Sequence, residues 1–236
     1  MKTVLFVPAR KGSTGIKGKN LVKLNGKPLI DYTLKICKKF SNKYYLFISS
    51  DCKKTLKYCQ KYGFKEKYVR PKKLSTSNSN IVDGIIHGVE WLKKEKKIEI
   101  SDVILLQPTS PLRKYSDLQK AIKIYKNKKL LSLTSVSKVR ENSLGHIKLN
   151  NNKQKWDFLY KSKKKIFRRQ DFPRGHFIFN GAFYICNYNF LKKNKILVKE
   201  NFSYLYETPR MISIDIDFKT DLDIAEALVI SKKVKI

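Results

Sequence analysis

Short apolar runs alternate along the chain with longer segments whose apolar residues recur at helical spacing. The runs end at polar residues or proline, which is typical of buried strands, and the longer segments indicate amphipathic helices. We expect strands at residues 3–7, 44–48, 68–69, 103–106 and 131–136, with helices at 28–40, 52–62, 81–92 and 117–126. Strands that alternate with helices of this length indicate a mostly parallel sheet covered on both faces. The pattern therefore predicts one three-layer α/β domain over residues 1–236, with no second domain.

The last third of the chain adds a different pattern. Residues 138–173 are polar and rich in Lys and Asn, with Trp156, Phe158 and Tyr160 interleaved. Regular order is expected again as strands at 177–186 and 212–218 and as a helix at 219–231. In 212–218 apolar and polar residues alternate strictly, which predicts Asp215 and Asp217 on one strand face, about 7 Å apart. Two carboxylates together with phosphate oxygens form the oxygen set that Mg²⁺ prefers.

The first strand-to-helix connection, residues 8–20, is rich in Gly, Lys and Ser. Ligands of open α/β sheets bind beyond the carboxyl ends of the strands, and glycine-rich loops there present backbone N–H groups to anions. The glycines at 12, 15 and 18 match neither the Walker A spacing nor GxGxxG. A phosphate-binding loop of a third kind is the hypothesis, and a basic surface loop is the alternative.

The formal net charge of +33 could indicate a nucleic-acid-binding protein. Lysine outnumbers arginine 44 to 8 and is scattered in doublets and triplets, which favours a solvated lysine-biased surface instead. The four cysteines have no CxxC spacing, so reduced thiols fit better than zinc or disulfides. No apolar run reaches the roughly 20 residues of a membrane helix. We therefore expect a cytoplasmic protein with no membrane and no specific nucleic-acid partner.

Several motifs resemble the acylneuraminate cytidylyltransferases, in the same order and across residues 3–228. Besides the loop at 8–20, they are Gly26–Leu29, Leu105–Arg113, Arg169–Pro173, Asn180–Tyr184 and Ile214–Asp217. The resemblance implies a Rossmann-like nucleotidyltransferase fold with a small dimerisation insertion at 138–173. It also implies transfer of CMP from CTP to the anomeric hydroxyl of a sialic-acid-like 2-keto sugar acid, with release of pyrophosphate. N-acetylneuraminic, legionaminic and pseudaminic acid are the candidate acceptors, and a homodimer and Mg²⁺ are expected.

The resemblance also implies roles for individual residues. The expected catalytic residues are Arg10, Lys19, Asp215 and Asp217, and the two aspartates are the expected metal ligands. The expected CTP-binding residues are Ala9, Arg10, Gly12, Ser13, Gly15, Lys19, Asn20, Arg70, Thr76 and Ser77. The expected sugar-binding residues are Gln107, Arg113, Arg169, Gln170, Asn180 and Tyr184. Thr14 stands where many members of the family have a basic residue, and Tyr184 could instead be a core residue.

Three alternatives stay open at this point. A related sugar nucleotidyltransferase could use another nucleotide, an eight-carbon keto acid or a sugar 1-phosphate. A nucleic-acid-binding module would explain the charge but not the paired aspartates. An inactive scaffold would not require Arg10, Lys19, Asp215 and Asp217 together.

Overall fold

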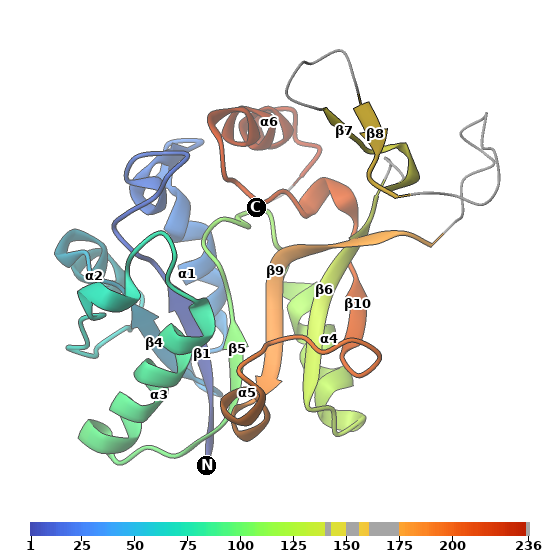
Figure 1. Ribbon diagram of the computed structural model, residues 1–236. Helices are drawn as coiled ribbons and strands as arrows, with labels where there is room; N and C mark the ends of the chain where they lie inside the picture. Colours follow the sequence, from blue (N-terminus) through green and yellow to red (C-terminus); the bar gives the residue numbers. More distant parts are fainter. Residues whose placement is uncertain (140–142, 150–155, 161–174, 235–236) are drawn as a thin grey trace.

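A six-stranded sheet forms the centre of the protein in a computed structural model that describes residues 1–139, 143–149, 156–160 and 175–234 (Figure 1). The strand order is β10-β6-β9-β5-β1-β4. The strands are β1 (Lys2–Pro8), β4 (Tyr45–Ser49), β5 (Ile100–Leu105), β6 (Ser132–Lys138), β9 (Phe177–Asn187) and β10 (Tyr204–Glu207). Strand β9 runs antiparallel to β5 and β6, and the other pairings are parallel. The predicted mostly parallel sheet is confirmed.

Six α-helices accompany this sheet in the described part of the chain. They are α1 (Leu29–Lys39), α2 (Lys53–Gln60), α3 (Ile81–Lys96), α4 (Tyr115–Asn127), α5 (Tyr188–Asn194) and α6 (Lys219–Ile230). Asn80 caps α3, because its side-chain oxygen accepts a hydrogen bond from the Val82 N–H at 2.9 Å. The predicted helices at 28–40, 52–62, 81–92, 117–126 and 219–231 are all present, within a few residues at each end.

Apolar side chains fill both faces of the sheet, which confirms the three layers. On one face, Ile30 and Leu34 of α1 and Leu118 of α4 pack with Leu5 and Val7 of β1. The alternate side chains of the same strand point to the opposite face, where α3 and α5 cover them. A third apolar cluster joins α6 to the start of α1 and to the short hairpin β2 (Lys23–Leu24) and β3 (Lys27–Pro28).

Two of the strands predicted from the sequence are wrong. Residues 212–218 form no strand: a short 3-10 helix, η5 (Arg210–Ile212), is followed by an irregular segment. The alternation has a different cause, because Ile212 and Ile216 pack beneath α6 while the backbone bonds to a loop and a helix end. Residues 68 and 69 are also outside any strand.

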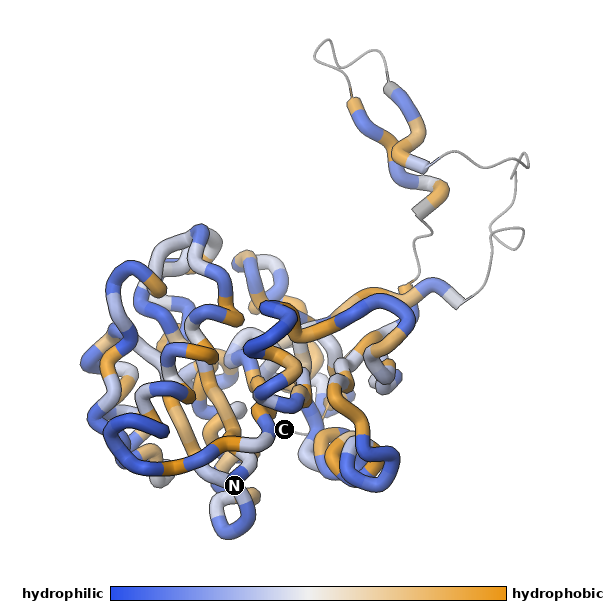
Figure 2. The backbone as a smooth tube through the Cα atoms, turned by 60° about the horizontal axis from the view of Figure 1, so that its bottom comes forward, coloured by the Kyte–Doolittle hydropathy of each residue, from blue (hydrophilic) through white to orange (hydrophobic). Residues whose placement is uncertain are grey.

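A small hairpin lies away from the sheet, within the insertion predicted at 138–173. It pairs β7 (Ile147–Leu149) with β8 (Trp156–Phe158) in antiparallel register, after the 3-10 turn η3 (Ser143–Gly145). Figure 2 shows hydrophobic positions along this hairpin, which stands apart from the body. Its exposed apolar side chains are Ile147, Leu149, Phe158, Leu159 and Tyr160.

Candidate active site

A cavity of about 350 Å³ opens beyond the carboxyl ends of β1 and β5, where the fold leads one to expect a ligand. Its walls come from the loop at 8–20, the segment at 70–81, the turn after β5 and the segment between η5 and α6. Its lining residues are Pro8, Arg10, Gly12, Ser13, Lys19, Asn20, Arg70, Leu74, Ser77, Ser79, Ile81, Gln107, Pro108, Thr109, Asp215 and Asp217. Polar and charged side chains dominate this list.

The loop at 8–20 is held in place by hydrogen bonds within the loop and to two neighbouring segments. The Asn20 side-chain amide donates a hydrogen bond to the Arg10 carbonyl at 2.9 Å, which closes the loop on itself. The Lys11 N–H donates to the Asp51 carboxylate at 2.6 Å, and the Arg10 guanidinium donates to the Thr76 carbonyl. These bonds fix the loop against the segments around Asp51 and Thr76.

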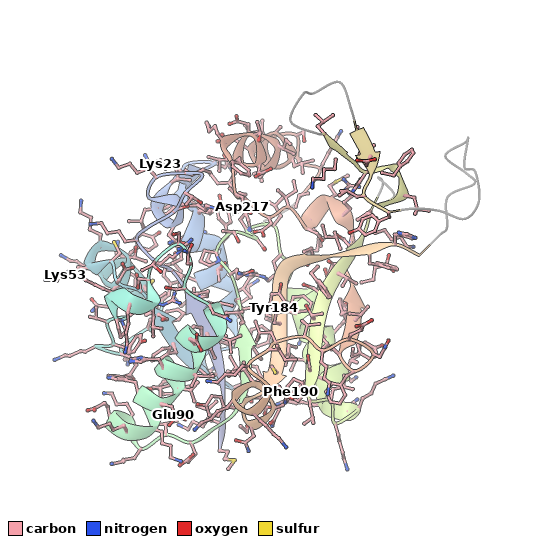
Figure 3. All side chains as sticks on the ribbon, viewed as in Figure 1. Lys23, Lys53, Glu90, Tyr184, Phe190 and Asp217 are labelled. Carbon is pink, nitrogen blue, oxygen red and sulfur yellow. The ribbon has the colours of Figure 1, made fainter. Side chains whose placement is uncertain are left out.

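The loop also contacts the aspartate segment directly. The Lys19 ammonium forms an ion pair with the Asp217 carboxylate, with 2.7 Å between Nζ and Oδ1. A Cβ atom on Gly15 would lie only 2.1 Å from the Asp217 carbonyl oxygen, so only glycine allows this approach. Figure 3 labels Asp217 where this segment passes below α6.

The segment at 215–218 is positioned by its backbone rather than by a sheet. The Ile216 N–H donates to the Thr109 carbonyl at 2.8 Å. The Asp221 carboxylate accepts from the N–H groups of Asp217 and Phe218, at 3.0 and 2.8 Å, and so caps α6. Both aspartates therefore reach the cavity although the predicted strand does not exist.

Asp215 lies in a polar recess at the edge of the cavity. Burial raises the pKa of its carboxyl, while a hydrogen bond from Thr109 and the nearby cations oppose that effect. A Cβ atom on Gly181 would lie 2.9 Å from Gln107 Oε1 and 3.3 Å from Asp215 Oδ2. The buried Ser110 hydroxyl points to the same place and has no hydrogen-bond partner among the described residues.

These donors suit a magnesium ion. Carboxylate and amide oxygens from Asp215, Asp217 and Gln107 are hard ligands, and Mg²⁺ is commonly held by one or two carboxylates, waters and phosphate oxygens. No group of three or more His, Cys, Asp or Glu side chains within the described residues could hold a metal by itself. The two aspartates would thus supply the protein's share of a site that phosphates and water complete.

Arg70 forms the opposite wall and is buried. Its guanidinium packs on Gly84 of α3, where a Cβ atom would lie 2.3 Å from one of its nitrogens. Burial lowers its pKa, and its Nε has no hydrogen-bond partner within the described part of the protein. A buried guanidinium whose Nε–H has no partner among the described residues favours binding of a ligand acceptor group at this wall.

Similarity to known proteins shows to which family the chain with this cavity belongs. The family model described as "Cytidylyltransferase" matches residues 4–235. The chain belongs to this cytidylyltransferase family. It is thus a nucleotidyltransferase, and the resemblance to acylneuraminate cytidylyltransferases is confirmed.

Three curated relatives are each 28% identical to this cytidylyltransferase. CMP-N,N'-diacetyllegionaminic acid synthase of Legionella pneumophila is matched over 97% of this chain and 96% of the relative. Pseudaminic acid cytidylyltransferase of Campylobacter jejuni shows the same coverage. For N-acylneuraminate cytidylyltransferase of Streptococcus agalactiae, the match covers 94% of this chain and about half, 52%, of the relative.

A solved structure of similar fold is CMP:2-keto-3-deoxy-manno-octonic acid synthetase complexed with CTP. It superposes with a TM-score of 0.67 over 98% of this chain and 100% of that one, at 18% identity. At this identity the likeness supports the fold alone, which confirms the predicted Rossmann-like nucleotidyltransferase architecture.

Most residues expected at the nucleotide side lie together in the cavity. Those that line it are Arg10, Gly12, Ser13, Lys19, Asn20, Arg70 and Ser77. The other three support the walls: Ala9 is buried and its carbonyl accepts from Ser50, Gly15 packs on Asp217, and the Thr76 carbonyl holds Arg10. Whether each one contacts CTP stays a prediction.

The residues expected at the sugar side are more dispersed. Gln107 lines the cavity, and the pKa of Tyr184 is raised by burial and by the charge of nearby Asp215. Asn180 is buried, and its amide is bonded to Ser135 and Thr208 at 2.7 Å each. Arg113 is buried and bonded to other elements of the fold. Arg169 and Gln170 lie outside the described residues.

Six lining residues are not among those predicted from the sequence. They are Pro8, Leu74, Ser79, Ile81, Pro108 and Thr109. Pro8, Pro108 and Thr109 adjoin predicted site residues at strand ends, so their position along the chain was a usable signal. Ser79 and the neighbouring apolar residues at 74 and 81 lie in the segment that contacts Arg10 through the Thr76 carbonyl. No local sequence pattern indicates this long-range contact.

Proposed function

We propose that this cytidylyltransferase transfers CMP from CTP to the anomeric hydroxyl of a nine-carbon, sialic-acid-like 2-keto sugar acid and releases pyrophosphate. The observation that carries the proposal is the meeting of Lys19 and Asp217 at one cavity. One cavity therefore contains both the cations that suit a triphosphate and the carboxylates that suit the metal ion bound to it. The names of the 28% identical relatives, which cover nearly the whole chain, support a legionaminic, pseudaminic or N-acetylneuraminic acid as acceptor.

In the proposed reaction the sugar's hydroxyl oxygen forms a bond to the α-phosphorus while the bond to the pyrophosphate oxygen breaks. Arg10, Lys19 and the N–H groups of the loop would bind the triphosphate and neutralise the charge that develops on the leaving group. Arg70 with Ser77 and Ser79 would hold the cytidine end of the nucleotide. Gln107 lines the side of the cavity toward Asp215, where the acceptor would be oriented for attack. Tyr184 packs against the core cluster behind it and would contact the sugar only at the edge of the site.

We also propose Mg²⁺ as the cofactor, held by Asp215 and Asp217. When bound, the ion would supply charge neutralisation at the phosphate oxygens. Binding of a metal at Asp217 competes with its present partner, so the Lys19 ammonium would become available to the triphosphate. The acidic sugar and the nucleotide are both anions, and the cationic wall of the cavity favours both.

A homodimer is proposed through the β7–β8 hairpin. Its apolar side chains, together with Phe177 and Phe179 at the adjoining start of β9, are exposed in the single chain. Exposed apolar clusters of this kind mark contacts with another protein surface. A sedimentation experiment that finds only monomer at micromolar concentration would count against the dimer.

The reaction is proposed to occur in the cytoplasm. All four cysteines are free, and three of them are buried, which suits a reducing compartment. Within the described residues, none of the helices combines the length and apolar character needed to span a bilayer.

Pyrophosphate release tests the proposed function. The protein would be incubated with Mg²⁺ and each of CTP, UTP, ATP and GTP, together with each of the three nine-carbon acids. An eight-carbon 2-keto sugar acid is tested alongside them. We expect release only with CTP and at least one nine-carbon acid. Release with CTP and only the eight-carbon acid, or only with a nucleotide other than CTP, would favour the related transferases over the proposed one.

A further inference from the structure

Arg113 lies at the junction of three elements beneath the acceptor side of the cavity. Its Nε donates to the Ala182 carbonyl of β9, and one terminal nitrogen donates to Thr33 Oγ1 of α1 at 3.2 Å. The other terminal nitrogen donates to the Gln107 carbonyl, just after β5, at 2.6 Å. Only 5% of the residue is exposed. Each of the three guanidinium nitrogens therefore donates a hydrogen bond to the protein itself.

The two carbonyls that Arg113 holds belong to positions that shape the site. Gln107 has its side-chain amide in the cavity, and Ala182 follows Gly181, which faces that amide across a very small gap. At Gly181 the backbone has φ of +69°, and any side chain would press on Gln107 Oε1. The spacing between the end of β5 and this part of β9 thus limits the room that the Gln107 amide has beside Asp215.

We propose that Arg113 is a positioning residue for the acceptor: it fixes Gln107 relative to β9 and so sets the geometry of the sugar-acid side. This inference rests on the proposed function and replaces the expectation that Arg113 itself binds the sugar. It also explains an arginine in a chain where lysine outnumbers arginine 44 to 8.

A lysine could not take over this role. The guanidinium is planar and presents several donors in fixed directions, so it reaches three acceptors on three elements at once. An ammonium places one nitrogen at the end of a flexible chain and cannot span the same acceptors. Burial lowers the pKa of Arg113 to about 10, which leaves the group charged at neutral pH with Asp215 as a nearby counter-charge.

The test compares Arg113→Lys and Arg113→Met with Thr33→Val, which removes the longest of the three Arg113 bonds and the long 3.5 Å bond from Thr33 Oγ1 to the Gln107 carbonyl but keeps the other two Arg113 bonds. The acceptor used is one that the unaltered protein accepts, so a failure of the proposed function appears earlier and separately. We expect the acceptor KM to rise at least tenfold in both Arg113 variants and less than threefold in Thr33→Val. The Kd of CTP, measured by calorimetry, should stay within twofold in all three.

A double-mutant cycle with Gln107→Ala separates positioning from an independent effect. If Arg113 acts through Gln107, adding Arg113→Lys to Gln107→Ala should change the acceptor KM by less than twofold. The inference is overturned if the effects of Arg113→Lys and Gln107→Ala on the acceptor KM multiply in the double variant. It is also overturned if Arg113→Lys alone leaves the acceptor KM unchanged. It is also overturned if the Arg113 variants lose CTP binding together with acceptor binding, because that result indicates general damage to the fold.

Discussion

Lys19 Nζ lies 2.7 Å from Asp217 Oδ1, which joins the loop after the first strand to a segment 198 residues further along the chain. The lysine side chain is 10% exposed and the aspartate side chain 60% exposed. The pair is therefore accessible from the aspartate side only. In a metal–triphosphate complex, Lys19 suits the phosphate oxygens and Asp217 suits the metal ion. The ion pair therefore marks the point where the metal ion and the triphosphate would meet.

Lys19→Met should lower kcat/KM for CTP by about a hundredfold, which is the usual order for loss of one charge-stabilising group. In the absence of CTP, the same variant should bind Mn²⁺ more tightly than the unaltered protein, because Asp217 loses its competing cation. Kinetics and Mn²⁺ titration followed by electron paramagnetic resonance measure the two effects. Lys23→Met, on the exposed part of the β2 strand, is the control. Equal Mn²⁺ affinity in all proteins would refute the competition.

Asp215→Asn and Asp217→Asn should each reduce activity at saturating Mg²⁺ by at least a hundredfold and raise the Mg²⁺ concentration needed for half-maximal rate. The reason is the loss of one of two carboxylate ligands. Asp223→Asn is the matched control, since Asp223 lies nearby but pairs only with Lys219 on the helix surface. Removal of Mg²⁺ with EDTA should abolish turnover, and full activity in EDTA would contradict the magnesium proposal.

Gly84→Ala should raise the KM for CTP several-fold while the protein stays folded. The added methyl group would displace the end of the Arg70 side chain, which is flexible enough to move away from the cavity wall. Gly88→Ala is the contrasting variant on the same helix, because its methyl group would press on Phe6 and Phe47 in the core. It should lower the melting temperature and leave the KM for CTP unchanged. An unchanged KM for CTP in Gly84→Ala, together with a raised KM for CTP in Gly88→Ala, would disprove the role given to Arg70.

Asp31→Asn should destabilise the protein by about 2 kcal/mol at pH 7, because the buried carboxylate accepts bonds from Tyr58, Tyr62 and Lys35. Burial acts to raise the pKa of Asp31, but these bonds outweigh it and the pKa is lowered. The stabilisation is therefore present above the unfolded pKa of about 4 and is lost as pH falls through the lower folded value.

Urea unfolding at pH 7 and at pH 3 measures this difference. The difference in the free energy of unfolding between Asp31→Asn and the unaltered protein should be smaller at pH 3 than at pH 7. The exposed Asp83→Asn in α3 should leave stability nearly unchanged at both pH values. A gap that widens on acidification would contradict the account of Asp31.

Much of the fold was predictable, because strong periodicity reports burial directly. The buried run of β1 and the helical spacing in α1 gave the right elements at nearly the right ends. The alternation around Asp215 and Asp217 led to a false strand, since apolar packing under α6 produces the same pattern as a sheet. Strand β10 was missed, because its sequence Tyr204–Glu207 gains its pairing only from β6.

Site residues that follow the end of a strand were predictable from the sequence. Site residues whose position depends on contacts with distant parts of the chain were less predictable. Arg10, Lys19 and Gln107 follow strands, and their place at the cavity follows from topology. Burial of Arg113 and Asn180 depends on three-dimensional neighbours that the motif does not reveal. A motif arginine can hold the site together instead of touching the ligand, and sequence alone does not separate these roles.

Transfer of CMP to a sugar acid can be followed in a single measurement, ³¹P NMR of the complete reaction. CTP, Mg²⁺ and N-acetylneuraminic, legionaminic or pseudaminic acid would be incubated with the protein, with Asp215→Asn as the inactive control. We expect a new phosphodiester signal and pyrophosphate in equal amounts with at least one acid, and neither with the control. Consumption of CTP without a phosphodiester, or no reaction with any of the three acids, would contradict the claim.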